Sequence, residues 1–202
     1  MNNNFMRKGF FIAIYGVNNI GKSTHAKLLV NKLISLGLDA IYIKYPLYEL
    51  EPTGPIINKI LRSDTPQRIS ETELQTLFTQ NRRDYEPQLK ALLEQNKIVI
   101  AEDYTGTGIA WGAAKGLKIS FLEKLNEGLL KEDLAILIKG KRDIRAREKS
   151  HIHENNDALV ERVSQILDEL AQRYDWKIVL LQEKIEDTFA LLWKEVRLKL
   201  LL

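Results

Sequence analysis

The sequence predicts an α/β domain with three layers, in which a five-stranded parallel sheet is covered by helices on both sides. Two observations support this fold class. Short apolar runs of strand length alternate with longer stretches whose apolar residues recur at intervals of three and four. The short runs are apolar at nearly every position, which is typical of strands buried on both faces of a parallel sheet.

The predicted strands are Phe10–Tyr15, Ala40–Lys44, Lys97–Glu102, Leu134–Lys139 and Lys177–Leu181. The predicted helices are Lys22–Leu36, Glu71–Gln95, Ile119–Leu129, Ala158–Tyr174 and Ile185–Leu200. Three prolines, at positions 46, 52 and 55, mark an irregular passage after the second strand. Ligands of parallel sheets bind beyond the carboxyl ends of the strands, so the segments after the first four strands are expected to meet at one site.

The composition limits the classes of protein to which this chain can belong. The 202 residues contain no repeat or Gly/Ser linker, so one domain spanning 1–202 is expected, with a lid segment at about 140–157. No apolar stretch approaches the ~20 residues of a membrane helix. The absence of cysteine excludes disulfides and favours a reducing, cytoplasmic setting. A net charge of +3, with both signs mixed along the chain, suits the binding of small anions better than the binding of nucleic acid.

The most specific motif is the segment GVNNIGKST, which fits G-x-x-x-x-G-K-[ST] and lies between the first strand and the first helix. Its glycines allow backbone N–H groups to turn around phosphate oxygens at a helix N-terminus. Lys22 can bridge the β- and γ-phosphates, and the Ser23 hydroxyl can bind Mg²⁺. The residues expected to bind a nucleoside triphosphate are Gly16, Val17, Asn18, Asn19, Ile20, Gly21, Lys22, Ser23 and Thr24.

GTPases, ATPases and kinases share such a loop. The chain has no N-K-x-D motif for guanine, and its length suits a small kinase with an acceptor pocket and a basic lid. The lid candidate is KGKRDIRAREKSHIHENND, Lys139 to Asp157, which carries Arg142, Arg145 and Arg147. Arginines that close over a transferring phosphoryl group accelerate transfer by factors of ~10³–10⁵. The alternative is a solvated basic helix face.

The acceptor candidate is LFTQNRRDYEPQL, Leu77 to Leu89. Phe78 and Arg82 are four residues apart and share one helical face. A ring beside a guanidinium can stack on a flat base and donate to its carbonyl edge. The alternative is that Phe78 belongs to the core.

Four stretches of the sequence together resemble the thymidylate kinase family of P-loop nucleoside monophosphate kinases, and they occur in family order. FIAIYGVNNIGKSTHAKLL is similar to the phosphate loop and first helix, and YPLYELEPTGPIINKILR to the F-P-R-Y segment. LFTQNRRDYEPQLKALLEQNKIVIAEDY resembles the segment that ends in D-R-Y, and TGTGIAWGAAKG follows where the family has S-x-x-A-[YF]-x-x-A-K-G.

This resemblance implies a P-loop kinase fold and ATP-dependent phosphorylation of dTMP to dTDP, with Mg²⁺ as cofactor. It implies a catalytic role for Lys22, Glu102 and an arginine of the lid, and places Ser23 and Glu102 on the magnesium side. The residues that it assigns to the acceptor are Tyr45, Phe78, Arg82, Tyr104, Thr107 and Trp111. Family members are commonly homodimers, so a homodimer without nucleic-acid or membrane partners is expected.

Three departures from the family pattern concern charge. Asn18 replaces the aspartate of the loop, Leu47 replaces the arginine of F-P-R-Y, and Asp103 replaces the arginine of D-R-Y. Two cations that usually hold the acceptor's phosphate are therefore missing. Three interpretations remain open: other cations take over, the acceptor is a neutral nucleoside, or only nucleotide binding remains. The candidate replacement cations are Lys44, Lys59, Arg62, Arg83 and Lys115.

Overall fold

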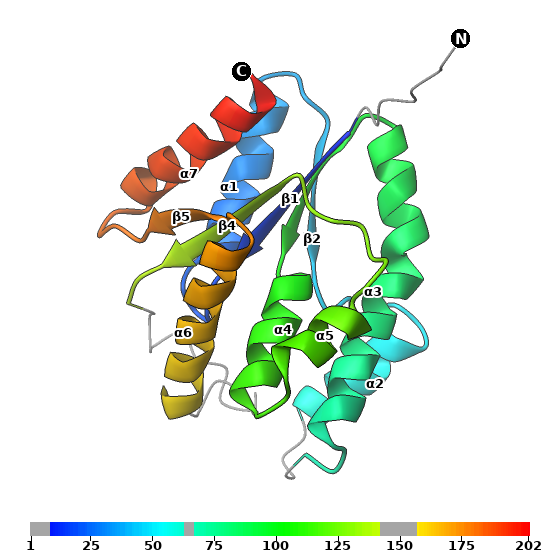
Figure 1. Ribbon diagram of the computed structural model, residues 1–202. Coiled ribbons are helices and arrows are strands. Elements are labelled where there is room, and N and C mark those ends of the chain that lie inside the picture. Colours follow the sequence, from blue (N-terminus) through cyan, green and yellow to red (C-terminus); the bar gives the residue numbers. More distant parts are fainter. Residues whose placement is uncertain (1–8, 63–66, 142–156) are drawn as a thin grey trace.

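A computed structural model describes residues 9–62, 67–141 and 157–202 of the protein. Its centre is a five-stranded sheet in which neighbouring strands run parallel in the order β2-β3-β1-β4-β5 (Figure 1). The strands are β1 (Phe10–Tyr15), β2 (Ala40–Lys44), β3 (Ile98–Glu102), β4 (Leu134–Lys139) and β5 (Lys177–Leu180). The predicted fold class is confirmed, and each strand begins and ends within one residue of its predicted bounds.

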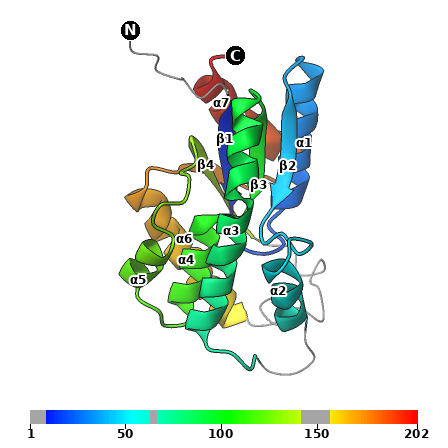
Figure 2. The same ribbon diagram turned by 90° about the vertical axis from the view of Figure 1, so that its right-hand side faces the viewer.

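Helices cover both faces of this sheet. They are α1 (Lys22–Ser35), α2 (Thr53–Leu61), α3 (Glu71–Glu94), α4 (Thr105–Ala114), α5 (Ile119–Leu125), α6 (Asp157–Arg173) and α7 (Ile185–Leu200). One face carries α1 and α7, and the other carries α3, α4 and α6, with α5 beside α4 (Figures 1 and 2). None of the helices in the described residues is both long and apolar enough to cross a membrane.

The strand order puts the phosphate loop at the middle of the carboxyl edge. Strand β1 lies between β3 and β4, so the chain that leaves Tyr15 enters the point where the strand order reverses. The register brings the end of β3 level with both neighbours, because Glu102 lies opposite Ile14 on one side and Lys44 on the other. Three strand ends therefore deliver side chains to one place.

Two helices were not predicted. Helix α2 lies inside the passage with the prolines, and Pro52 caps it while Pro55 occupies its first turn, where a missing N–H costs little. Helix α4 has the sequence TGTGIAWGAA, with a poor intrinsic propensity, but most of its residues are buried. Tertiary packing thus outweighs propensity. Helix α5 ends at Leu125, four residues before the predicted end at Leu129.

Glycine is required where α4 packs most closely. A Cβ atom at Gly106 would lie 2.4 Å from the Trp176 ring, and one at Gly108 would lie 2.7 Å from Nη2 of Arg82. Both contacts are shorter than real Cβ contacts. The small residues of α4 therefore let the helix approach Trp176 and the cavity-lining Arg82.

Candidate active site

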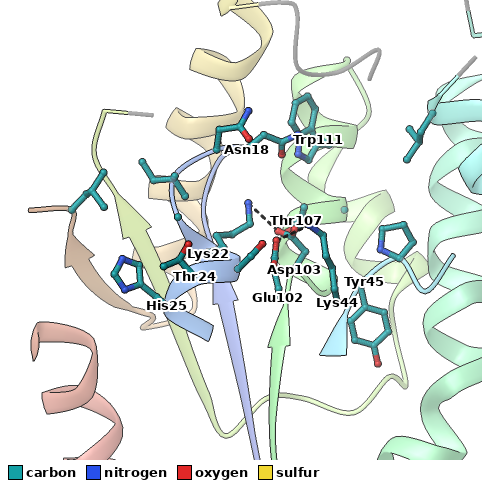
Figure 3. A pocket seen from close by; sticks show the side chains of 18 of the residues that line it. Asn18, Lys22, Thr24, His25, Lys44, Tyr45, Glu102, Asp103, Thr107 and Trp111 are labelled. Atoms are coloured by element: carbon teal, nitrogen blue, oxygen red, sulfur yellow. Dashed lines mark hydrogen bonds and ion pairs between the residues drawn. The ribbon is translucent and has the colours of Figure 1, made fainter. Parts of the chain in front are cut away.

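A cavity of about 770 Å³ opens at the carboxyl edge of the sheet. Its wall is built from the phosphate loop, the ends of β2 and β3, one face of α3 and α4, and the segment after β5. The volume falls in the range of ~300–1,000 Å³ that small-molecule sites occupy. One continuous space thus joins the phosphate loop to the α3–α4 side (Figure 3).

The phosphate loop holds its lysine close to the loop backbone. Lys22 Nζ donates hydrogen bonds to the carbonyl oxygens of Gly16, at 2.8 Å, and Val17, at 3.0 Å. It also lies 3.7 Å from Oδ1 of Asp103, and only 4 % of the side chain is exposed. A left-handed φ of 92° at Gly21 leads directly into α1. The loop therefore presents a charged, buried lysine at the N-terminus of a helix, which is an arrangement that binds phosphate.

Two adjacent carboxyl groups, those of Glu102 and Asp103, lie close to Lys22, and their environments act differently on their pKa values. Burial acts to raise the pKa of Glu102, but the charges of Lys22 and Lys44, with hydrogen bonds from Ser23 and Tyr42, hold that pKa below its usual range. Burial raises the pKa of Asp103, and the neighbouring Glu102 carboxylate adds to the effect while Lys22 opposes it. The two neighbouring carboxyl groups thus have pKa values shifted in opposite directions, downward for Glu102 and upward for Asp103.

Ser23 and Glu102 have the chemistry that a magnesium site needs. The hydroxyl of Ser23 is hydrogen-bonded to Glu102, so both oxygens reach the same region at the start of α1. The described residues contain no group of three or more His, Cys, Asp or Glu that could hold a metal by themselves. Mg²⁺ is commonly bound by one or two protein oxygens, several waters and substrate phosphates, and these two residues fit that mode.

At the other end of the cavity, Arg82 extends from α3 toward α4. Its Nη1 donates to Oδ1 of Asn126 at 3.1 Å, and its side chain is almost fully buried. Its Nε has no hydrogen-bond partner among the described residues. Phe78, one helical turn before Arg82 on α3, and Trp111 of α4 also line the cavity. An aromatic surface beside a buried donor is suited to a flat heterocyclic base.

The comparisons with known proteins agree with this geometry. The family model for thymidylate kinase matches residues 14–191. The thymidylate kinase of Dictyostelium discoideum is 26 % identical over 185 residues, covering 90 % of this chain and 82 % of that protein. The thymidylate kinase of African swine fever virus is 30 % identical over 137 residues, 68 % of this chain but only 54 % of the viral protein. The solved thymidylate kinase of Candida albicans superimposes with a TM-score of 0.80 at 27 % identity, covering 94 % of this chain and 92 % of that one.

The chain belongs to the thymidylate kinase family. The predicted family and the predicted enzyme class, a nucleoside monophosphate kinase, are therefore confirmed. The comparisons also support phosphorylation of dTMP, and nothing in them favours a neutral nucleoside acceptor or a protein that only binds nucleotide.

The structure brings most of the predicted site residues of this thymidylate kinase family member to the cavity wall. The residues that line it are Asn18, Asn19, Ile20, Gly21, Lys22, Ser23, Thr24, Tyr45, Phe78, Arg82, Glu102, Thr107 and Trp111. Gly16 and Val17 contribute through their carbonyl oxygens, which hold Lys22. The lid arginines Arg142, Arg145 and Arg147 lie outside the described residues.

Tyr104 is placed differently from the other predicted acceptor residues. Its side chain is 1 % exposed and does not line the cavity. Its ring packs edge-on against the ring of Phe11, and its centroid lies 5.1 Å from that of the Tyr45 ring. Thr107 lines the cavity, but its hydroxyl already donates to Oδ1 of Asp103 at 2.7 Å. The Asp103 carboxylate is thus held between Thr107 and Lys22.

Sequence reasoning missed the wall formed after β5. The segment Leu181–Gln182–Glu183, together with Ile185 and Thr188, lines the cavity near the phosphate loop, as does His25 of α1. This segment directly follows β5, and its place beyond the carboxyl end of a parallel strand is the signal in the sequence that predicts it.

Proposed function

We propose that the cavity binds ATP-Mg²⁺ and dTMP together and that the enzyme transfers the γ-phosphoryl group of ATP to the phosphate of dTMP, releasing ADP and dTDP. The observation that carries this proposal is the continuous cavity between Lys22 and the pair Phe78–Arg82. A nucleotide phosphate at the loop and a base at α3 would then face each other across the two carboxylates.

The donor is proposed to lie along the phosphate loop and the segment after β5. Backbone N–H groups of the loop would surround the phosphate oxygens, and Lys22 would leave the carbonyl oxygens of Gly16 and Val17 to contact the β- and γ-phosphates. Ser23 and Glu102 would hold Mg²⁺, which supplies positive charge beside the phosphates when bound. These groups position and stabilise charge, and such effects provide most of the catalysis in phosphoryl transfer.

The acceptor base is proposed to stack on Phe78 and to be read by Arg82. The Arg82 guanidinium is already oriented by Asn126, so little side-chain entropy is lost when it donates to a base carbonyl. Thr107 and Trp111 of α4 also line the cavity, as does Tyr45, which directly follows β2. A buried arginine left without its carbonyl partner is costly, which would favour bases that carry one.

The enzyme is proposed to act as one domain in the cytoplasm and to form a homodimer. The cytoplasmic setting is supported by the absence of cysteine, and the homodimer by the family resemblance. Sedimentation velocity at micromolar concentration tests the oligomeric state. A homodimer would have a molecular mass of about twice the 23.3 kDa of the chain.

An ADP-release assay with ATP-Mg²⁺ and a panel of acceptors tests the reaction. The panel contains dTMP, dUMP, dCMP, dGMP, thymidine and deoxycytidine. Turnover is expected on dTMP and not on thymidine. Lys22→Ala should reduce turnover by at least ~10²–10³-fold, whereas Lys124→Ala, an exposed lysine on α5, should not. Turnover on thymidine with none on dTMP, or no turnover on any acceptor, would overturn the proposed function.

A further inference from the structure

The acceptor side of the cavity has an unusual balance of charge. Glu102 and Asp103 are adjacent and both line the cavity, between Lys22 and Lys44 (Figure 3). The phosphate of a nucleoside monophosphate would bring up to two further negative charges close to this pair. Like charges at a few ångströms repel strongly where little water screens them, so cations must face the phosphate.

Five cations among the described residues line the cavity: Lys22, Lys44, Arg62, Arg82 and Lys141. Lys22 belongs to the phosphate loop, and Arg82 is turned toward Asn126 at the base end. Lys141 follows β4, which lies on the opposite side of β1 from β2 and β3. Of these five cations, Lys44 and Arg62 are therefore the candidates for contact with the acceptor's phosphate.

Lys44 is the last residue of β2 and lies opposite Glu102 in the sheet. Its Nζ is 3.0 Å from Oε1 of Glu102, and half of its side chain, 51 %, is exposed. An ammonium group has three N–H donors, and the ion pair engages one of them. Although burial opposes it, the charge of Glu102 and the hydrogen bond to it raise the pKa of Lys44, so the amine stays charged.

Arg62 follows α2 directly and is oriented by two neighbours. Its guanidinium lies over the ring of Tyr48, with 4.6 Å from Cζ to the ring centroid, and its Nη1 donates to Oδ1 of Asn58. Tyr48 also lines the cavity and belongs to the same loop as Leu47. Stacking on an aromatic ring limits the orientations of the planar guanidinium, and a guanidinium is suited by its geometry to bidentate contact with a phosphate.

Three other cations close to this region in sequence are directed elsewhere. Lys115 Nζ pairs with Glu71 at 2.8 Å, and Arg83 Nη2 donates to the carbonyl oxygens of Leu125 and Glu127. Lys59 is exposed on α2 and does not line the cavity. The structure thus separates the cations that reach the cavity from those that do not.

We propose that Lys44 and Arg62 bind the phosphate of the nucleoside monophosphate acceptor and that Tyr48 positions Arg62. This inference rests on the proposed function, because it assigns the phosphate contacts of the same site. Positive charge from the end of a strand and the end of a helix then takes the place of the arginines absent at Leu47 and Asp103. The enzyme selects a monophosphate over a nucleoside through these two side chains.

Isothermal titration calorimetry with dTMP and with thymidine tests the assignment on the intact protein. The wild type should bind dTMP at least ~10-fold more tightly than thymidine, and Lys44→Met and Arg62→Ala should each weaken dTMP binding by about 10- to 100-fold. Thymidine affinity should not change. In the double variant the two affinities should become similar. Tyr48→Phe should retain dTMP binding, and Tyr48→Ala should weaken it.

Two matched variants control for general effects. Lys90→Met removes a lysine that is 52 % exposed and paired with Glu86, and Lys59→Ala removes a cation on α2, the helix that ends just before Arg62. Both should bind dTMP like the wild type. Any of three results would overturn the assignment. The double variant could bind dTMP as tightly as the wild type, the variants could lose equal affinity for dTMP and thymidine, or the wild type could bind both compounds with equal affinity. If the wild type still phosphorylates dTMP in that case, the proposed function stands and only the phosphate contacts are wrong.

Discussion

The side-chain amide of Asn81 binds both backbone groups of Leu47. Its Oδ1 accepts from the Leu47 N–H at 2.8 Å, its Nδ2 donates to the Leu47 carbonyl oxygen at 3.0 Å, and Nδ2 also lies 3.0 Å from Oγ1 of Thr53. Asn81 is fully buried and adjoins Arg82 on α3. One side chain therefore connects the helix that carries Arg82 to the loop that carries Tyr48.

Asn81→Ala should lower the free energy of unfolding by about 2–3 kcal/mol, because it removes these hydrogen bonds and leaves backbone groups of Leu47 without their partner. Urea unfolding measures the change. The control is Gln80→Ala, which removes an exposed hydrogen bond to Asp84 on the same helix and should cost less than about 0.5 kcal/mol. Equal losses in the two variants would contradict a special role for Asn81.

Glu102→Gln should reduce turnover by about 10²–10³-fold and raise the Mg²⁺ concentration needed for half-maximal rate, because it removes a charge and preserves the shape of the side chain. Initial rates over a range of Mg²⁺ at saturating ATP and dTMP measure both effects. Tyr42→Phe is the graded control, since it removes one hydrogen bond to the same carboxylate and leaves its charge. An unchanged Mg²⁺ dependence in Glu102→Gln would exclude Glu102 from the magnesium side.

Gly108→Ala should raise the KM for dTMP by about 10-fold and leave the KM for ATP unchanged. The new methyl group would lie 2.7 Å from Nη2 of Arg82 and 3.2 Å from Oε1 of Gln75, so the guanidinium must move. Alanine has the higher helix propensity, by ~1 kcal/mol, so the fold should be retained. Steady-state kinetics with each substrate varied in turn separate the two constants. A parallel rise in both would indicate damage beyond Arg82.

His25 should make the protein sensitive to mild acid. The side chain is 2 % exposed, its Nδ1 has no hydrogen-bond partner among the described residues, and burial lowers its pKa. The unfolded chain, with a histidine pKa of about 6.5, then binds more protons than the folded one. Stability is therefore retained above that value and lost as pH falls from it toward the lower folded pKa.

The measurement is the free energy of unfolding at pH 7.5 and pH 5.5 for the wild type and for His25→Gln. Glutamine does not titrate in this range, so the variant should lose less stability between the two values. Identical losses would show that the acid sensitivity arises from other groups.

Much of the framework follows from local sequence. The five strands are recognisable because every position in β1 and most positions in β4 must be apolar when both faces of the sheet are covered. The phosphate loop is recognisable because nine consecutive residues carry the glycines, the lysine and the serine that it needs. Four of the five strand ends were correctly predicted to meet at one site.

Other features could not be read from the sequence because they depend on segments far apart in the chain. Arg82 meets Asn126 across 44 residues, and Asn81 meets Leu47 across 34. Helix α4 forms despite its glycines because burial against Arg82 and Trp176 outweighs its weak propensity.

The sequence by itself determined the fold class, the phosphate loop and the family, since each depends on periodicity or on motifs within short stretches. Only the tertiary structure decided which charges share the cavity. It pairs Asp103 with Lys22, turns Lys115 toward Glu71, and brings Lys44 and Arg62 to the wall of the cavity. Charges interact through distances in space, and the sequence gives positions along the chain.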